Sequence, residues 1–297
     1  RSIRQGYLDR NPLMPEYAAG MADGFAAMKD KRGYHMIRGI KSAASGFTII
    51  GVSGVGKSTA VERVLSLYPQ RIIHIRYQEK PFAFTQLVWL KLDCPHDGSL
   101  KQLCYQFFYE VDMAAGTDYF QQYAKVRHSL DMLLIIMTQL VRQFQIGILV
   151  IDEIQHLSEA KGGGSDKMLN FFVTLVNTIG LPVIMIGTTK AMSILQSEFR
   201  QARRGSGQGD LIWDRMRNDV AWNVFVKSMW RYQWTGKNVA YTDGLSDALY
   251  DESQGIIDIA VKLYAIIQID AITSGVEEFS ISGIHKAAEK KLGLVKP

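Results

Sequence analysis

The sequence predicts an α/β fold, with a central parallel sheet flanked by helices and a small all-helical domain at the C-terminal end. Short apolar runs, typical of buried strands, alternate with helical patterns as far as about residue 240. Only helical patterns follow that point. We therefore expect an arm and lead-in helix over residues 1–46, an α/β domain over residues 47–240 and a helical domain over residues 241–297.

Each expected strand is a short run of apolar or β-branched residues. Residues 47–50 precede a glycine-rich turn, and residues 71–77 alternate with period two. Residues 146–151 and 183–186 are continuous apolar runs, which favour strands buried on both faces. The expected strands are residues 47–50, 71–77, 84–92, 146–151 and 183–186.

Helical patterns follow these strands. Ser99 is the expected N-cap of one helix, because a serine hydroxyl can accept a hydrogen bond from the first free N–H groups. A triple glycine at residues 162–164 forms the expected loop before another helix. The expected helices are residues 16–29, 57–67, 99–113, 119–144, 167–179, 245–252, 256–273 and 281–292.

The composition indicates a soluble globular protein with a mild excess of positive charge. Lys and Arg number 34 against 29 Asp and Glu, which suits either an anionic partner or a solvated basic surface. Cys94 and Cys104 have neither metal-site nor disulfide spacing, so we expect a cytoplasmic location. Polar residues interrupt the apolar stretch 132–151, so no membrane partner is expected. Because the chain begins at Arg1 rather than at Met, we expect it to be part of a longer protein.

Residues 51–59 match the pattern of a phosphate-binding loop (P-loop), in which Gly, four variable residues and Gly-Lys-Ser follow a strand and precede a helix. Backbone N–H groups of such a loop surround phosphate oxygens. Lys57 would neutralise the β- and γ-phosphates, and the Ser58 hydroxyl would bind Mg²⁺. ATP and Mg²⁺ are the expected cofactors. The expected nucleotide contacts are Gly51, Val52, Ser53, Gly54, Val55, Gly56, Lys57, Ser58 and Thr59.

Two further strand ends carry polar side chains that suit ATP hydrolysis. Asp152 and Glu153 end the apolar run 148–151, at the edge where open α/β sheets bind ligands. Asp152 would hold Mg²⁺, and Glu153 would orient and polarise the attacking water. Thr188, in preference to Thr189, would sense the γ-phosphate; the alternative is that these threonines only begin a turn or cap a helix. We therefore expect an Mg²⁺-dependent ATPase.

Together these motifs resemble those of the AAA+ ATPases. More specific segments, from about residue 40 to about residue 290, resemble the TnsC branch of transposon target-selection ATPases, whose relatives include TniB, MuB and IstB. The resemblance makes residues 47–240 an AAA+ P-loop nucleotide-binding domain and residues 241–297 its helical lid. The segments that carry it, besides the P-loop, are residues 90–99, 101–104, 150–157 and 229–235.

The resemblance implies a bacterial, DNA-associated homo-oligomer. Such proteins form an ATP-dependent ring or spiral on double-stranded DNA, and they link a target-selection protein to the transposase. Hydrolysis would release the assembly. The alternative is an AAA+ motor on DNA, such as a helicase or clamp loader, which would share the same active site. A small-molecule kinase is disfavoured, because beyond Glu153 we find no group that would serve an acceptor.

In such oligomers an arginine from the neighbouring protomer completes the ATP site. Arg200, Arg203 and Arg204 follow the sensor strand where this arginine would lie, and Arg203 and Arg204 are the preferred candidates. Each could instead belong to the basic face of a solvated helix. One departure from the family concerns the lid: Asp258 stands near the place where many AAA+ lids carry an arginine. We therefore expect the lid to respond to nucleotide through packing and oligomer contacts.

Basic residues on the expected helices after the second strand are the candidates for contact with DNA phosphates. They are Lys101, Lys125 and Arg127, with His128 beside them. A run of aromatic residues precedes the helical domain, and core packing or a protomer interface is favoured for it over base stacking. These aromatic residues are Trp213, Trp222, Trp230, Tyr232 and Trp234.

Overall fold

The computed structural model describes residues 4, 7–8, 10–11, 13–14, 46–77, 79–125, 128–159, 170–173, 175–176, 180–192, 210–278 and 280–291. The chain divides into two compact units. Unit 1 comprises Arg1–Ile50 and Ser58–Ile212, and unit 2 comprises Gly51–Lys57 and Trp213–Pro297. The helix expected over residues 16–29, and most of the helix expected over residues 167–179, lie outside the described residues.

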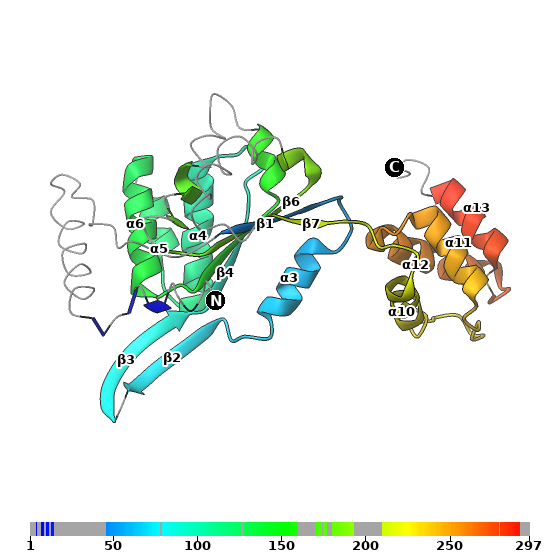
Figure 1. The fold of residues 1–297 in the computed structure, drawn as a ribbon, viewed down its shortest axis with the longest axis horizontal. Helices are drawn as coiled ribbons and strands as arrows, with labels where there is room; N and C mark the ends of the chain where they lie inside the picture. Colours follow the sequence, from blue (N-terminus) through cyan, green and yellow to red (C-terminus); the bar gives the residue numbers. More distant parts are fainter. Residues whose placement is uncertain are drawn as a thin grey trace. The chain divides into compact units, whose positions relative to one another are not determined.

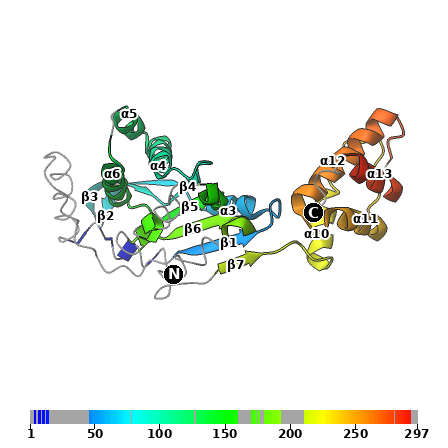
Figure 2. The same ribbon diagram turned by 90° about the horizontal axis from the view of Figure 1, so that it is seen from above.

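Unit 1 is built on a five-stranded sheet with strand order β4-β5-β6-β1-β7 (Figures 1 and 2). The pairs β4–β5, β5–β6 and β6–β1 are parallel, which confirms the expected central parallel sheet. β5 and β6 are buried along their whole length, as their continuous apolar sequences predict. The strands are β1 (Phe47–Gly51), β4 (Trp89–Asp93), β5 (Ile148–Asp152), β6 (Val183–Gly187) and β7 (Asp210–Trp213).

β7 was not predicted from the sequence, because it is short and largely exposed and so lacks a clear apolar pattern. It lies at the edge of the sheet beside β1. Close approach of the two strands explains one glycine of the P-loop. A Cβ atom at Gly51 would collide with the backbone carbonyl of Trp213.

Helices cover the sheet, and Figures 1 and 2 show α4, α5 and α6 together on one side of it. Ser99 caps α4 as expected, since its side chain accepts a hydrogen bond from the Gln102 N–H. The single helix expected over residues 119–144 is wrong, because the structure contains two helices there. Ser129 starts the second one and accepts from the Met132 N–H. The helices are α3 (Lys57–Leu65), α4 (Leu100–Ala115), α5 (Tyr119–Ala124) and α6 (Leu130–Gln143).

A separate two-stranded ribbon extends beyond the sheet (Figure 1). It consists of β2 (Arg71–Tyr77) and β3 (Lys80–Leu87), which pair antiparallel. The expectation that residues 71–77 form part of the parallel sheet is therefore wrong. The strand expected over residues 84–92 is also divided, since β3 ends at Leu87 and β4 begins at Trp89. Period two predicts an extended strand but does not specify its partner.

Among the described residues, unit 2 contains four helices around a core of its own: α10 (Val220–Met229), α11 (Asp243–Ser253), α12 (Ile257–Ser274) and α13 (Ile281–Lys291). α10 was not predicted, yet it belongs to this core together with the three expected helices. The expected domain boundary between residues 240 and 241 consequently falls inside unit 2. None of the described helices is long and apolar enough to span a membrane.

The aromatic residues at positions 222–234 differ in burial. Trp222 and Trp230 are 0% and 6% exposed and lie in the core of unit 2, as the core-packing interpretation predicts. Tyr232 and Trp234 are 73% and 65% exposed, so they do not contribute to that core. The structure thus separates residues that the sequence placed in one group.

We expect Trp222→Ala to destabilise unit 2 by about 3–5 kcal/mol, because it removes a large, fully buried side chain. The substitution also removes the hydrogen bond from the indole N–H to the Ser246 carbonyl at 3.3 Å and an edge-to-face contact with Tyr250. Denaturant unfolding followed by circular dichroism would measure the change. The matched control is Trp234→Ala, whose side chain is exposed and which should change stability by less than about 0.5 kcal/mol.

Candidate active site

The P-loop begins where β1 ends and reaches α3 through two glycines with positive φ. Gly54 and Gly56 have φ of 79° and 88°, in the left-handed region that favours glycine. α3 starts at Lys57, so its first N–H groups face the loop, as they do in helix N-termini that bind anions. The local backbone is therefore that of a phosphate cradle.

Lys57 is held at this loop by backbone acceptors. Its side chain is buried, and its ammonium group donates to the Gly51 carbonyl at 3.0 Å and to the Val52 carbonyl at 2.7 Å. The positive charge is thus fixed beside the backbone that would surround a phosphate group. This is the position that the sequence pattern predicts for the phosphate-neutralising lysine.

The C-terminal helices contact the P-loop within unit 2. The Asp258 N–H donates to the Gly54 carbonyl at 2.9 Å, and a Cβ at Gly54 would lie only 3.0 Å from the Asp258 Cβ. The Asp258 carboxylate forms an ion pair with Lys262 at 2.6 Å. The start of α12 therefore meets the loop through the backbone and through an acidic side chain.

Asp152 lies at the buried end of β5, and its carboxylate is next to a lysine. Lys91 Nζ lies 2.8 Å from Glu62 Oε1, 3.3 Å from Asp152 Oδ2 and 3.6 Å from Asp93 Oδ1. Burial alone would lower the pKa of Lys91, but its hydrogen bond to Glu62 and the nearby carboxylates outweigh burial and raise that pKa. Lys91 therefore stays charged and balances the acidic strand end.

Glu153 follows Asp152 and leaves the sheet with its side chain exposed. Its backbone N–H donates to Asp152 Oδ1 at 2.8 Å, and its φ of 57° is in the left-handed region. The Gln155 side chain donates from Nε2 to Glu153 Oε2. Gln155 belongs to the short 3₁₀ helix η1 (Ile154–Glu159), so the chain turns back toward the catalytic carboxylate predicted from the sequence.

Thr188 follows β6, which lies between β1 and β5 in the sheet. Its hydroxyl oxygen is buried and has no hydrogen-bond partner within the described residues. Thr188 precedes the 3₁₀ helix η3 (Thr189–Ala191), but its side chain makes no capping hydrogen bond. An unpaired buried hydroxyl is costly, and a ligand oxygen or a water molecule would satisfy it.

Lys91 and Gln155 were not predicted from the sequence as site residues. A charged residue inside the apolar strand Trp89–Asp93 was a signal for Lys91, because such residues are rarely buried without partners. The polar position two residues after Glu153 was a weaker signal for Gln155. The partners of these two residues cannot be read from local spacing. Pairing of β4 with β5 brings Lys91 to Asp152, and the path of η1 brings Gln155 to Glu153 and Thr188.

Three arginines are candidates for completing the ATP site of a neighbouring protomer, and they lie outside the described residues: Arg200, Arg203 and Arg204. Arg127, one of the DNA candidates, is outside them as well. Lys101 lies in the first turn of α4, with its ammonium 5.8 Å from the centre of the Tyr105 ring. Lys125 is exposed at the end of α5.

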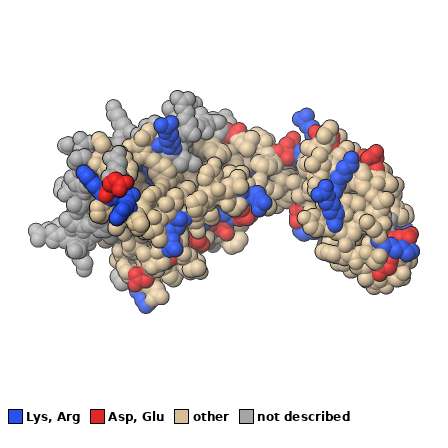
Figure 3. All heavy atoms as spheres, turned by 90° about the horizontal axis from the view of Figure 1, so that it is seen from below, with Lys and Arg blue, Asp and Glu red and all other residues tan. Residues whose placement is uncertain are grey.

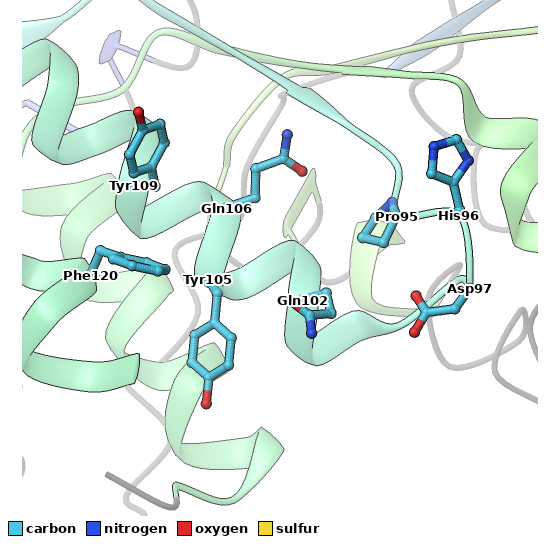
Figure 4. A pocket seen from close by; sticks show the side chains of 8 residues that line it. All are labelled: Pro95, His96, Asp97, Gln102, Tyr105, Gln106, Tyr109 and Phe120. Carbon is cyan, nitrogen blue, oxygen red and sulfur yellow. The ribbon is translucent and has the colours of Figure 1, made fainter. Parts of the chain in front are cut away.

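An open pocket of about 560 Å³ lies beside the turn that follows β4 (Figure 4). The rings of His96 in this turn and His156 in η1 have centroids 4.2 Å apart. Cys94 lies just before this turn. Burial raises the pKa of its thiol to about 12, with smaller contributions from the charges of Asp97 and Glu153, so this thiol is protonated at neutral pH. The pocket is lined by Pro95, His96, Asp97, Gln102, Tyr105, Gln106, Tyr109 and Phe120.

The fold and these strand ends define a P-loop nucleotide-binding protein. Residues 40–195, more than half of the chain, match the family described as AAA domain. The chain belongs to this family and is an AAA+ ATPase. No curated protein matches the sequence.

Solved structures similar to this chain include ORC and Cdc6 proteins. The Aeropyrum pernix ORC1 protein, in complex with DNA, has a TM-score of 0.58 and 14% identity over 97% of this chain and 69% of its own. Cdc6p from Pyrobaculum aerophilum has a TM-score of 0.58 and 11% identity over 96% and 70%. The structure of A. pernix ORC2, in ADPNP–ADP complexes, has a TM-score of 0.53 and 11% identity, and the match covers 94% of this chain and 68% of ORC2. At these identities the likeness shows the fold.

Proposed function

We propose that this chain is an ATP-dependent regulator of DNA transposition, which assembles as a ring or spiral on double-stranded DNA. ATP binding drives assembly, the assembled oligomer recruits the transposase, and hydrolysis drives disassembly. The observation that carries the enzymatic part is the buried Thr188 hydroxyl, which lacks a partner in the described structure and follows the strand between β1 and β5. A hydroxyl in this place is suited to a γ-phosphate oxygen or the attacking water.

Each residue then has one task in hydrolysis. The P-loop backbone and Lys57 bind the β- and γ-phosphates. Glu153 orients and polarises the attacking water, and Thr188 holds the water or the phosphate in line. Asp152 is 3% exposed, and the Lys91 ammonium lies 3.3 Å from its Oδ2. All of these groups follow carboxyl ends of strands in one parallel sheet, the edge at which such sheets bind ligands.

The residues also fit Mg²⁺. This ion usually takes one or two protein carboxylates or hydroxyls together with substrate phosphates, and Asp152 and Ser58 offer such a pair. Within the described ranges no three His, Cys, Asp or Glu side chains form a metal site by themselves, so the nucleotide would have to complete the ligand set. When bound, Mg²⁺ would neutralise phosphate charge.

The proposed link to transposition rests on the segments that resemble TnsC-type ATPases. In the structure two of these segments meet. β4 pairs with β5 in the sheet, and the ring of His96, in the turn after β4, contacts the ring of His156 in η1. We propose that this side of the AAA+ domain includes surfaces for the transposase or the target-selection protein. Arg203 or Arg204 of a neighbouring protomer would complete the ATP site.

DNA contact is proposed at the exposed Lys125, at Lys101 and at Arg127. In Figure 3, the Lys and Arg side chains on the face shown form separate groups rather than one continuous patch. Backbone contact by several protomers, each with a few basic side chains, is consistent with that pattern. The ORC1 structure similar to this chain is a complex with DNA.

The test is electron microscopy of the chain with duplex DNA and a non-hydrolysable ATP analogue. Closed rings or spirals around DNA are expected, and isolated monomers would contradict the proposal. With ATP, the assemblies should dissociate as hydrolysis proceeds. Directed movement along DNA or strand displacement would instead identify a motor.

For the proposed DNA contact, we expect Lys125→Ala to weaken binding to duplexes of unrelated sequence about equally. It should also reduce the salt dependence of binding by about one unit of slope, because a phosphate contact releases about one counterion. The measurement is a titration of fluorescent DNA at several salt concentrations. The control is Lys286→Ala, which removes an exposed lysine from α13. Equal losses in the two variants would refute a specific contribution of Lys125.

A further inference from the structure

Gln155 connects the proposed catalytic carboxylate with the end of the neighbouring strand. Its Nε2 donates to Glu153 Oε2, and its Oε1 accepts from the Thr188 N–H at 3.0 Å. The amide can bind these partners in only one orientation, because a carboxylate accepts and a backbone N–H donates. One side chain thus joins the segment after β5 to the segment after β6.

Close packing keeps Gln155 in this position. A Cβ atom at Gly187 would lie 2.5 Å from Ile154 Cγ1 and 3.1 Å from Gln155 Oε1. Ile154 itself is fully buried. The glycine at the end of β6 therefore lets η1 approach closely enough for the amide to reach the Thr188 N–H.

Glu153 needs such a restraint. Its side chain is exposed, so packing alone does not select one rotamer. Its backbone is in the left-handed region, which is unfavourable for a non-glycine residue and is commonly maintained at functional sites. The hydrogen bond from Gln155 fixes the one part of this residue that would touch the attacking water.

We propose that Gln155 is a positioning residue for ATP hydrolysis, which holds the Glu153 carboxylate at a set place relative to Thr188. The inference rests on the proposed role of Glu153. Both Glu153 and Thr188 would act on the same water or phosphate, so a link between them determines whether they act together. Such positioning matters, because a misplacement of about 1 Å can reduce the rate by about 100-fold.

Three substitutions separate the hydrogen bonds from simple packing. Gln155→Ala removes the side chain, and Gln155→Met keeps its length and volume without either hydrogen bond. Gln155→Glu keeps the acceptor for the Thr188 N–H but places a second carboxylate against Glu153. We expect kcat to fall by about 10- to 100-fold in the alanine and methionine variants and further in the glutamate variant. KM should change by less than about twofold, since the P-loop is intact.

The control is Gln122→Ala, which removes a hydrogen bond of the same type on α5. Gln122 Nε2 donates to Asp118 Oδ1 at 2.6 Å. ATP turnover with duplex DNA present should be unchanged in this variant. Normal kcat in Gln155→Met would overturn the inference, because packing would then suffice. Higher kcat in any Gln155 variant would overturn it as well, since the hydrogen bond would then restrain rather than assist Glu153.

Failure of this inference is distinguishable from failure of the proposed function. If Glu153→Gln hydrolyses ATP normally, the proposed base is wrong whatever the Gln155 variants do. If Glu153→Gln is inactive and Gln155→Met is normal, only the role of Gln155 is wrong. Measuring both variants in the same assay therefore decides between the two cases.

Discussion

Glu153→Gln is expected to keep ATP binding and to lower the rate of hydrolysis by about 100-fold or more. The amide is as large as the carboxylate but cannot accept a proton from the attacking water, and general-base assistance contributes about 10²–10⁴-fold. The P-loop, Lys57 and Asp152 are unchanged, so nucleotide affinity should be retained. Because hydrolysis is proposed to release the assembly, the variant should form long-lived oligomers on DNA.

Phosphate release under single-turnover conditions would measure the rate, and the lifetime of DNA-bound oligomers would be followed in parallel. Glu289→Gln is the matched control, because it makes the same chemical change at an exposed position of α13. Hydrolysis at the normal rate in Glu153→Gln would show that another group is the base. Slow hydrolysis combined with normal dissociation from DNA would separate hydrolysis from disassembly and refute the proposed switch.

Local sequence patterns predicted the parts of the fold that depend on neighbouring residues. The P-loop pattern requires glycine at position 56, where the structure has a positive φ. Continuous apolar runs predicted β5 and β6, and the N-cap preference of serine predicted the start of α4 at Ser99. In each case the physical cause acts over a few residues, so the sequence contains it directly.

The features that the sequence did not predict depend on long-range pairing. The partner of β2 is a second ribbon strand rather than the sheet, and an alternating pattern is equally compatible with both. Lys91 becomes a neighbour of Asp152 only because β4 and β5 pair in register. Gln155 reaches Thr188 only because Gly187 permits close packing.

The contact between α12 and the P-loop offers a route by which the proposed lid can respond to nucleotide. The Asp258 N–H binds the Gly54 carbonyl, so the start of α12 is attached to the loop backbone itself. A change in the loop on nucleotide binding would then be passed to the C-terminal helices through this contact. We propose that the lid responds to nucleotide through the P-loop backbone, with Asp258 and Lys262 forming an ion pair of their own.

Lys57→Ala is expected to lower ATP affinity by about 100-fold or more and to abolish assembly on DNA. The lysine is 7% exposed, and two loop carbonyls hold its ammonium group in place. Within residues 51–59 no other side chain is basic, so the loop itself offers no replacement for the lost charge. Truncating one partner of a buried charge pair costs about 2–5 kcal/mol, and 2.7 kcal/mol corresponds to 100-fold in affinity.

Two measurements separate lost binding from lost folding. The midpoint of thermal unfolding without nucleotide should be close to that of the unaltered chain, whereas the stabilisation that ATP provides should disappear. Lys286→Ala, on α13, should retain both the stabilisation and the assembly. Ordered oligomers of Lys57→Ala on DNA in the absence of bound nucleotide would refute the proposal, because assembly would then not require ATP. Loss of assembly in a variant that still binds ATP would instead assign Lys57 a role in transmitting the bound state to the rest of the chain.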